Sequence, residues 1–361
     1  MIRHSLQKFI AQLDKLLNHL HILENLDSVN EEIQASNLVA DIKKHAISVL
    51  RKNTDEKIFD YNANIISLYG YWEQYIEAVI KEYLIELKGL NSGNDEKNNI
   101  IGARYKKSII ALFNKISGNS PKFRHLTDEN LINAMYIGCS QKQNNYIPEA
   151  FFQSGGNYNY SETSDCLRRL GFSSIDNELK FYPSLKTYFV NQGISEITLK
   201  KSSVITLYSK LNNLVSYRNE IAHGGSDGSN LLSIEDIKDY ITFMKSFASS
   251  ITEYFNDDIL AVKWSLRKSN SIKVHRFYDN LHVAELEKGT FFLDMNKEVF
   301  CYKGTKRIPH YMFVKIKEMK INGVNPNSPF YLSLDSSDVI TIKFEQDVKS
   351  GFQSSNPQPP S

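Results

Sequence analysis

Cysteine is scarce in this chain, and the common zinc-binding spacings are missing. The 361 residues include three cysteines, Cys139, Cys166 and Cys301, with no Cys-x-x-Cys and no His-Glu-x-x-His pattern. An odd number of widely separated cysteines argues against a disulfide framework, and zinc sites need closely spaced thiolates or imidazoles. The sequence therefore predicts a reducing compartment, the cytoplasm, and a protein with no metal and no other cofactor.

Long apolar runs and glycine-rich phosphate loops are also missing. No stretch approaches the roughly 20 apolar residues needed to cross a bilayer. The first 20 residues have apolar positions at helical spacing with charges between them, which is typical of an amphipathic helix and not of a signal peptide. No closely spaced acidic pair follows a strand. These absences predict a soluble protein without a membrane partner, and they argue against a metal-dependent nuclease or nucleotidyltransferase.

Charge of one sign does not dominate the chain as a whole. The 43 Lys and Arg residues and 41 Asp and Glu residues leave a net charge of +2. Basic side chains nevertheless outnumber acidic ones in residues 259–349, and acidic ones are in excess before residue 259. A basic module is compatible with contact to a polyanion, but so modest an imbalance serves solubility equally well.

Helical periodicity dominates the sequence up to about residue 255. Apolar residues recur at helical spacing, and a polar cluster at 91–99 interrupts the pattern. Residues 233–236 have the form of a capping box. The spacing predicts helices at about 3–26, 31–53, 62–88, 103–116, 128–137, 163–170 and 196–223, and a last one from 233 to about 255.

Residues 146–160 are irregular and rich in tyrosine. Exposed tyrosines could form a surface on which unpaired bases stack, since every base has an aromatic face. Aromatic side chains are also ordinary packing material. The second interpretation is favoured, so we expect these tyrosines to pack on the helical body.

From about residue 260 the apolar period changes to two. Alternating or β-branched segments are separated by glycines, and Asn322-Gly323 is typical of a tight turn. The sequence predicts an α+β multidomain chain. Its parts are a helical domain over residues 1–257 with an inserted irregular region at about 90–195, a small basic antiparallel β domain of barrel or sandwich type over 258–348, and a disordered tail over 349–361.

A candidate site lies at residues 218–225, which read Arg-Asn-Glu-Ile-Ala-His-Gly-Gly at the end of a helical stretch. Imidazole can take or give a proton near neutral pH, and a guanidinium can bind the non-bridging oxygens of a phosphodiester. Asn219 and His223 are four residues apart and share a helix face, whereas Arg218 is offset. Such an arrangement suits RNA cleavage without a metal. Alternatively, His223 only caps the helix dipole while Arg218 pairs with Glu220 or another acid.

Arg276 and His282 repeat the arginine-then-histidine order within the β region. They flank an expected turn, and no helix end presents them together. We therefore do not expect a second site there.

The motif Arg218-Asn219-Glu220-Ile221-Ala222-His223-Gly224 resembles the signature of the HEPN superfamily, whose ribonucleases have an arginine, four to six residues and a histidine. Residues 68–84, which contain the Trp72-Glu73 pair, resemble the first core helix of the MAE_28990/MAE_18760-like branch, where a Trp-Glu pair opens a helix beside the motif helix. The resemblance covers roughly residues 1–256.

This resemblance implies an all-α HEPN-type bundle that forms a homodimer, in which two motifs make one cleft that cuts single-stranded RNA. Arg218 and His223 take the catalytic places, Asn219 takes the polar place after the arginine, and Glu73 and Glu220 are candidate supporting residues. The favoured alternative for Glu73 is a solvated charge on the surface of its helix. The products would have 2′,3′-cyclic phosphate and 5′-hydroxyl ends. The branch further implies a bacterial defence or toxin system, transfer RNA as a candidate substrate, and a regulatory or antitoxin protein from a neighbouring gene.

A second hypothesis assigns the chain no catalysis. Many members of the superfamily have lost catalysis, and the chain could be a dimerising scaffold or sensor subunit that binds a partner protein through its β domain. The intact Arg218 and His223 favour the nuclease.

Overall fold

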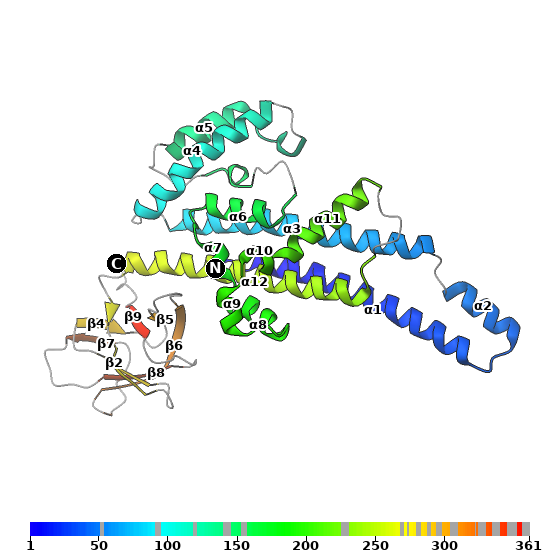
Figure 1. Ribbon diagram of the computed structural model, residues 1–361. Coiled ribbons are helices and arrows are strands. Elements are labelled where there is room, and N and C mark those ends of the chain that lie inside the picture. Colours follow the sequence, from blue (N-terminus) through cyan, green and yellow to red (C-terminus); the bar gives the residue numbers. More distant parts are fainter. Residues whose placement is uncertain are drawn as a thin grey trace. The chain divides into compact units, whose positions relative to one another are not determined.

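The computed structural model describes residues 1–50, 54–90, 95–117, 121–139, 146–152, 157–224 and 231–267, followed by a set of β-strands and Gly323. The chain divides into two compact units, one of residues 1–91 and 96–255, the other of residues 92–95 and 256–361 (Figure 1). The helices are α1 (His4–Ala35), α2 (Ala40–Leu50), α3 (Thr54–Gly89), α4 (Asp95–Ser117), η1 (Pro121–Phe123), α5 (Asp128–Cys139), η2 (Pro148–Ala150), α6 (Tyr160–Arg169), α7 (Ile175–Leu179), α8 (Pro183–Asn191), α9 (Glu196–Lys201), α10 (Val204–Leu207), α11 (Ser209–Ala222) and α12 (Ile234–Arg267).

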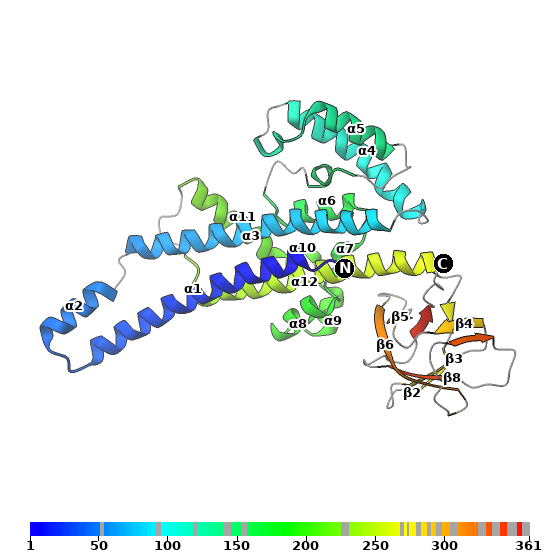
Figure 2. The same cartoon turned by 180° about the vertical axis from the view of Figure 1, so that it is seen from behind.

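Three long helices, α1, α3 and α12, form the centre of the first unit and lie side by side in both views (Figures 1 and 2). Aromatic side chains join them. Trp72 of α3 stacks on Phe247 of α12 with ring centres 5.4 Å apart, and Phe9 of α1 stacks on Tyr75 of α3 at 4.9 Å. All four are at most 2% exposed. Such offset aromatic pairs stabilise a core beyond their buried area, so this cluster fixes how the three helices pack.

The first turn of α1 is capped by a side chain from another helix. Glu82 of α3 accepts hydrogen bonds from the backbone N–H groups of Arg3, His4 and Ser5 at 2.8, 3.1 and 3.0 Å, and from the Ser5 hydroxyl at 2.7 Å. Burial alone would raise the pKa of Glu82, but these hydrogen bonds outweigh it and hold the pKa below its ordinary value. An ionised carboxylate at this position satisfies N–H groups that the helix itself leaves unpaired.

We expect Glu82→Gln to lower the free energy of unfolding by about 1–2 kcal/mol at pH 7, because the uncharged amide is a weaker acceptor for the helix N-terminus. Since the carboxyl pKa is lower in the folded chain than in the unfolded chain, its contribution is full above the unfolded value. It is lost as the pH falls through the folded value. Urea unfolding of the variant and the wild type from pH 7 to pH 3 should therefore converge in acid, whereas Glu31→Gln, at an exposed site on α1, should follow the wild type throughout.

The helix boundaries differ from the expected ones in several places. The expected motif helix at 196–223 is three helices, α9, α10 and α11. The helix expected to end near residue 255 continues to Arg267 as α12. Within the expected irregular region, the helices predicted at 103–116, 128–137 and 163–170 are present as α4, α5 and α6, whereas α7 and α8 were not expected. Trp72 lies in the middle of α3 and does not open it.

The tyrosines of the irregular stretch at 146–160 pack inward, as expected. Tyr146, Tyr158 and Tyr160 are at most 9% exposed, and the Tyr146 ring lies 4.8 Å from that of Tyr105 in α4. These three rings therefore do not form a surface for stacking bases.

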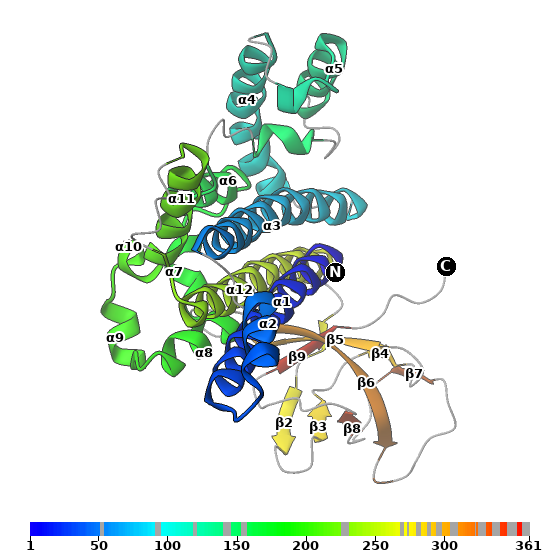
Figure 3. The ribbon, with the colours of Figure 1, turned by 90° about the vertical axis from the view of Figure 1, so that its right-hand side faces the viewer.

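The second unit contains an antiparallel sheet, which confirms the expected α+β class. Its strands are β1 (Ser271–Ile272), β2 (Val274–Tyr278), β3 (Val283–Leu286), β4 (Thr290–Leu293), β5 (Glu298–Lys303), β6 (His310–Ile321), β7 (Phe330–Ser333), β8 (Ile340–Phe344) and β9 (Phe352–Ser355). Seven of them form one sheet in the order β1-β9-β5-β6-β8-β3-β2, and β4 pairs with β7. The long strand β6 pairs with β5 along its first half and with β8 along its second (Figure 3).

Three predictions for the C-terminal region can be compared with the structure. Phe352–Ser355, within the expected disordered tail, form β9 and pair with β5. Arg276 lies in β2, whereas His282 and Asn322 lie outside the described residues. Gly323 has a φ of 81°, in the left-handed region that favours glycine.

Candidate functional site

The site begins with helix α11 and the way it ends. Leu211, Leu214 and Val215 are buried and fix the orientation of the helix, which packs against α3. The helix stops at His223, whose N–H donates to the carbonyl of Asn219 at 3.0 Å, and Gly224 follows with a φ of 72°. A left-handed residue directly after the last turn is a common helix terminator and is most easily glycine. The expected glycine stop after His223 is confirmed.

Arg218 is half-buried and held in one orientation. Its Nη1 donates to the side-chain oxygens of Asn219 at 3.1 Å and Asn157 at 3.2 Å, and its guanidinium carbon lies 5.2 Å from the centre of the Tyr69 ring. The Asn157 amide also donates to Asn219 at 2.9 Å. Two neutral amides and an aromatic face thus orient the guanidinium and leave its charge uncompensated. Within the described part of the chain Arg218 forms no ion pair, so the pairing with Glu220 considered for the capping alternative is not observed.

Asn157 is placed by a short segment that is fastened at several points. The backbone carbonyl of Tyr158 accepts from Trp72 Nε1 at 3.1 Å, and the Tyr158 N–H donates to the hydroxyl oxygen of Tyr69 at 2.9 Å. Two residues later, the N–H of Tyr160 donates to the side chain of Asn212 in α11 at 3.0 Å. The segment is therefore fixed to α3 and α11, the two helices that also present Tyr69 and Arg218.

The sequence gives no local signal for Asn157. It precedes Arg218 by 61 residues and lies in the stretch that we interpreted only as aromatic packing. What brings it to the motif is the tertiary hydrogen bonding of the adjacent Tyr158, which no periodicity in the sequence shows. The site contains this residue in addition to those expected.

Tyr69 remains an uncharged phenol at neutral pH. Burial raises its pKa to about 12, although the hydrogen bond from Tyr158 and the positive charge of Arg218 act in the opposite direction. A neutral ring offers Arg218 its negative face without neutralising the cation, which is the geometry of a cation–π contact.

Two further residues were expected to support the site, and the structure does not bring either against Arg218. Glu73 lies four residues after Tyr69 on α3 and pairs with Lys122 at 3.3 Å. Lys122 also pairs with Glu77 and lies 5.3 Å from the centre of the Tyr158 ring. Glu220 is exposed on α11. Glu73 therefore forms a cluster of charges with Lys122 and Glu77. This cluster lies about one turn along α3 from Tyr69, whose ring contacts Arg218.

His223 is exposed at the end of α11. Its backbone completes the last turn, and among the described residues its imidazole makes no hydrogen bond or ion pair. Arg218 lies on the preceding turn and is held by other groups. The arrangement presents an oriented cation and an accessible imidazole at the same helix end, with the imidazole open to a ligand.

The described residues show neither a metal site nor a membrane span. No group of three or more His, Cys, Asp or Glu side chains there is arranged to hold a metal ion. None of the helices in that part is both long enough and apolar enough to span a bilayer.

Comparison with known proteins identifies a family. The family model described as RiboL-PSP-HEPN matches residues 24–257, which is more than half of the chain and includes α3 and α11. No curated protein and no solved structure matches significantly. The match confirms the HEPN resemblance, while the finer branch named from residues 68–84 stays a prediction.

Proposed function

The chain belongs to the RiboL-PSP-HEPN family, and from this premise we propose that it is a metal-independent endoribonuclease acting on single-stranded RNA. HEPN domains are generally associated with ribonuclease activity. The substrate's own 2′-hydroxyl would attack the adjacent phosphorus while the 5′-oxygen leaves. The products are a 2′,3′-cyclic phosphate and a 5′-hydroxyl.

The orientation of Arg218 is the observation that carries this proposal. Asn157, Asn219 and the Tyr69 ring hold its guanidinium without neutralising it, one turn before the exposed His223. A preorganised cation of this kind stabilises charge as it develops on the phosphate. His223 transfers the proton at the 2′ or the 5′ oxygen, and Asn219 holds the arginine toward the phosphate.

A single histidine cannot be both base and acid in the same step. We propose that two chains associate so that two copies of the motif share one cleft, with one imidazole neutral and the other protonated. The exposed position of His223 leaves it free for such a contact. Specific cleavage activity should then fall on dilution in parallel with the dimer fraction measured by sedimentation.

By family analogy, the setting is a bacterial defence or toxin system with transfer RNA as a candidate substrate and a regulatory protein partner.

The experiment that tests the proposal is incubation of the purified protein with total cellular RNA in EDTA, followed by mapping of the new ends. We expect cleavage to persist in the chelator and to leave 2′,3′-cyclic phosphate ends. A DNA oligonucleotide of the same sequence should stay intact because it lacks the 2′-hydroxyl. Loss of cleavage in EDTA, or cutting of DNA, would refute the mechanism, and intact RNA from a demonstrated dimer would favour the non-catalytic scaffold or sensor.

Asn157 should act as a positioning residue through Arg218. We expect Asn157→Ala to reduce kcat/KM for RNA by about tenfold to a hundredfold, since a hydrogen bond to a charged group contributes on the order of 1.5–3 kcal/mol. Single-turnover cleavage of a fluorescent RNA measures this loss.

Two controls distinguish positioning from a general effect on the fold. Asn133→Ala, at an exposed position on α5, should leave cleavage unchanged. In an Arg218→Ala background the Asn157 substitution should cause almost no further loss, because the group that it positions is gone. Additive losses in the double variant would show that Asn157 does not act through Arg218.

A further inference from the structure

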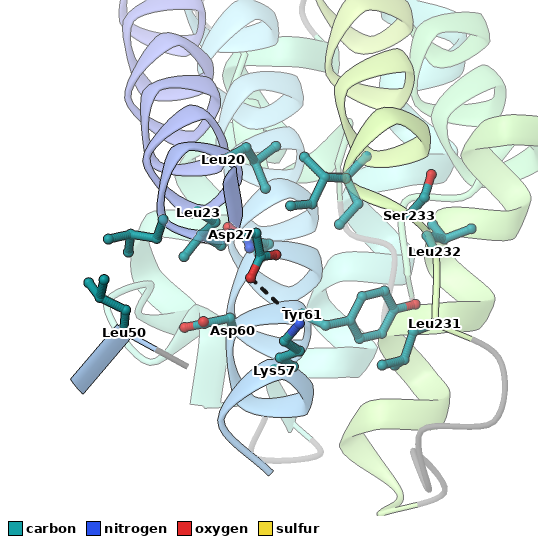
Figure 4. Close-up of a pocket in the computed structure, with 14 residues that line it drawn as sticks. Leu20, Leu23, Asp27, Leu50, Lys57, Asp60, Tyr61, Leu231, Leu232 and Ser233 are labelled. Atoms are coloured by element: carbon teal, nitrogen blue, oxygen red, sulfur yellow. Dashed lines mark ion pairs between the residues drawn. The ribbon is translucent and has the colours of Figure 1, made fainter. Parts of the chain in front are cut away.

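A pocket of about 240 Å³ lies in the helical unit, between α1, α2, α3 and the start of α12 (Figure 4). Its walls are largely aliphatic, with Leu20 and Leu23 from α1, Leu50 from α2, and Leu231 and Leu232 just before α12. Apolar walls with a few polar groups are the usual composition of a small-molecule site.

The polar group that marks this pocket as more than a packing gap is Asn64. Its side chain lines the pocket and is 3% exposed, and within the described part of the chain its amide makes no hydrogen bond. An amide that lines the pocket and has no partner in the described residues is available to a ligand that can hydrogen-bond to it.

The other polar groups around the pocket are already satisfied. Tyr61 hydrogen-bonds the backbone of Leu232, and burial raises its pKa to about 12, so it is uncharged. Lys57 and Asp27 pair with each other at 3.6 Å and are both more than half exposed (Figure 4), and Asp60 has an interaction of its own. Among the described residues that line the pocket, each charged side chain therefore already has an interaction, and none is left to hold an ionic ligand.

We infer that this pocket binds a small uncharged molecule with an apolar body and one hydroxyl or carboxamide group, which pairs with Asn64. A dry cavity of about 150 Å³ is large enough for benzene. A pocket of about 240 Å³ therefore holds one aromatic ring with a short polar substituent. An ammonium or carboxylate on the same body would lose its hydration without gaining an ion pair.

The pocket touches the chain that follows the motif, just before and at the start of α12. Leu231, Leu232 and Ile234 line it from the α12 side, and Tyr61 is electrostatically coupled to Tyr217 and Glu220 on α11. A bound ligand thus contacts residues that begin eight positions after His223. An effect on RNA cleavage rests on the proposed function, whereas binding itself does not.

Calorimetric titration of the full chain with benzyl alcohol, toluene and benzylammonium tests the inference. We expect benzyl alcohol to bind with a dissociation constant on the order of 0.1–1 mM. Toluene should bind about threefold to tenfold more weakly, since it has no group for Asn64. Benzylammonium should not bind measurably.

Three variants test whether these molecules bind in this pocket. Asn64→Leu keeps the branched shape of the side chain but removes its amide, so it should abolish the preference for benzyl alcohol over toluene. Leu231→Trp fills the pocket from an exposed position and should abolish binding of both, while Ile132→Trp, exposed on α5, should leave both unchanged. Equal affinity for benzyl alcohol and toluene in the wild type, tighter binding of benzylammonium, or unchanged binding in Leu231→Trp would each overturn the inference, whether or not the protein cleaves RNA.

Discussion

RNA cleavage should fall by about 10²–10⁴-fold when His223 is replaced by alanine, because proton transfer by a positioned side chain contributes a factor of that size. The imidazole is exposed and its side chain takes no part in the packing of α11, whose last turn is closed by the backbone of the residue. Stability should therefore change little. Initial rates on a fluorescent single-stranded RNA in EDTA, with thermal unfolding measured in parallel, separate the two effects.

The matched control is His45→Ala, which removes an exposed imidazole from α2 and should leave cleavage at the wild-type rate. Arg218→Lys is a second variant of interest, since it keeps the positive charge but loses the planar fork that contacts Asn157 and Asn219. We expect a loss of at least about tenfold for that variant. Cleavage within a factor of two of the wild type in His223→Ala would reduce this residue to a helix cap and remove it from the mechanism.

The sequence located the motif because its determinants are local. The stop after His223 follows from Gly224, and the pairing of α3 with α11 agrees with the family resemblance of the segment around Trp72. Reasoning from local sequence also explains why some helix boundaries were predicted wrongly. Residues 196–223 contain no glycine or proline and were interpreted as one helix, but Ser203 accepts a hydrogen bond from the N–H of Ile205 and caps a new helix, which ends the preceding one.

Asn157 shows the limit of such reasoning for the site itself. Its place beside Arg218 depends on the hydrogen bonds that Trp72 and Tyr69 make with Tyr158, across 86 and 89 residues of sequence. The spacing of apolar residues indicates which face of a helix is buried, but it does not indicate which distant segment will pack against that face. A motif can therefore be found from sequence, while a residue such as Asn157 that reaches it from a distant segment cannot.

Trp72 should be the position at which fold and site are most closely linked. It is fully buried, stacks on Phe247 and donates to the backbone of Tyr158. We expect Trp72→Ala to lower the free energy of unfolding by about 3–5 kcal/mol, as for other large aromatic residues in packed cores. Denaturant unfolding followed by circular dichroism measures this loss.

Trp72→Phe separates packing from positioning. Phenylalanine retains most of the apolar contact but has no N–H, so the Tyr158 carbonyl loses its partner at a cost of about 1–3 kcal/mol. Because that carbonyl fixes the segment that carries Asn157, cleavage by the folded protein should also fall. Phe255→Leu disturbs a different part of the aromatic core, where the Phe255 ring contacts Tyr83 and Phe172, and it should reduce stability without reducing the cleavage rate of folded molecules. If Trp72→Phe lost the stability expected above but cleaved RNA at the wild-type rate, the hydrogen bond from Trp72 to Tyr158 would be structural only. The orientation of Arg218 would then depend on Asn219 and Tyr69 alone.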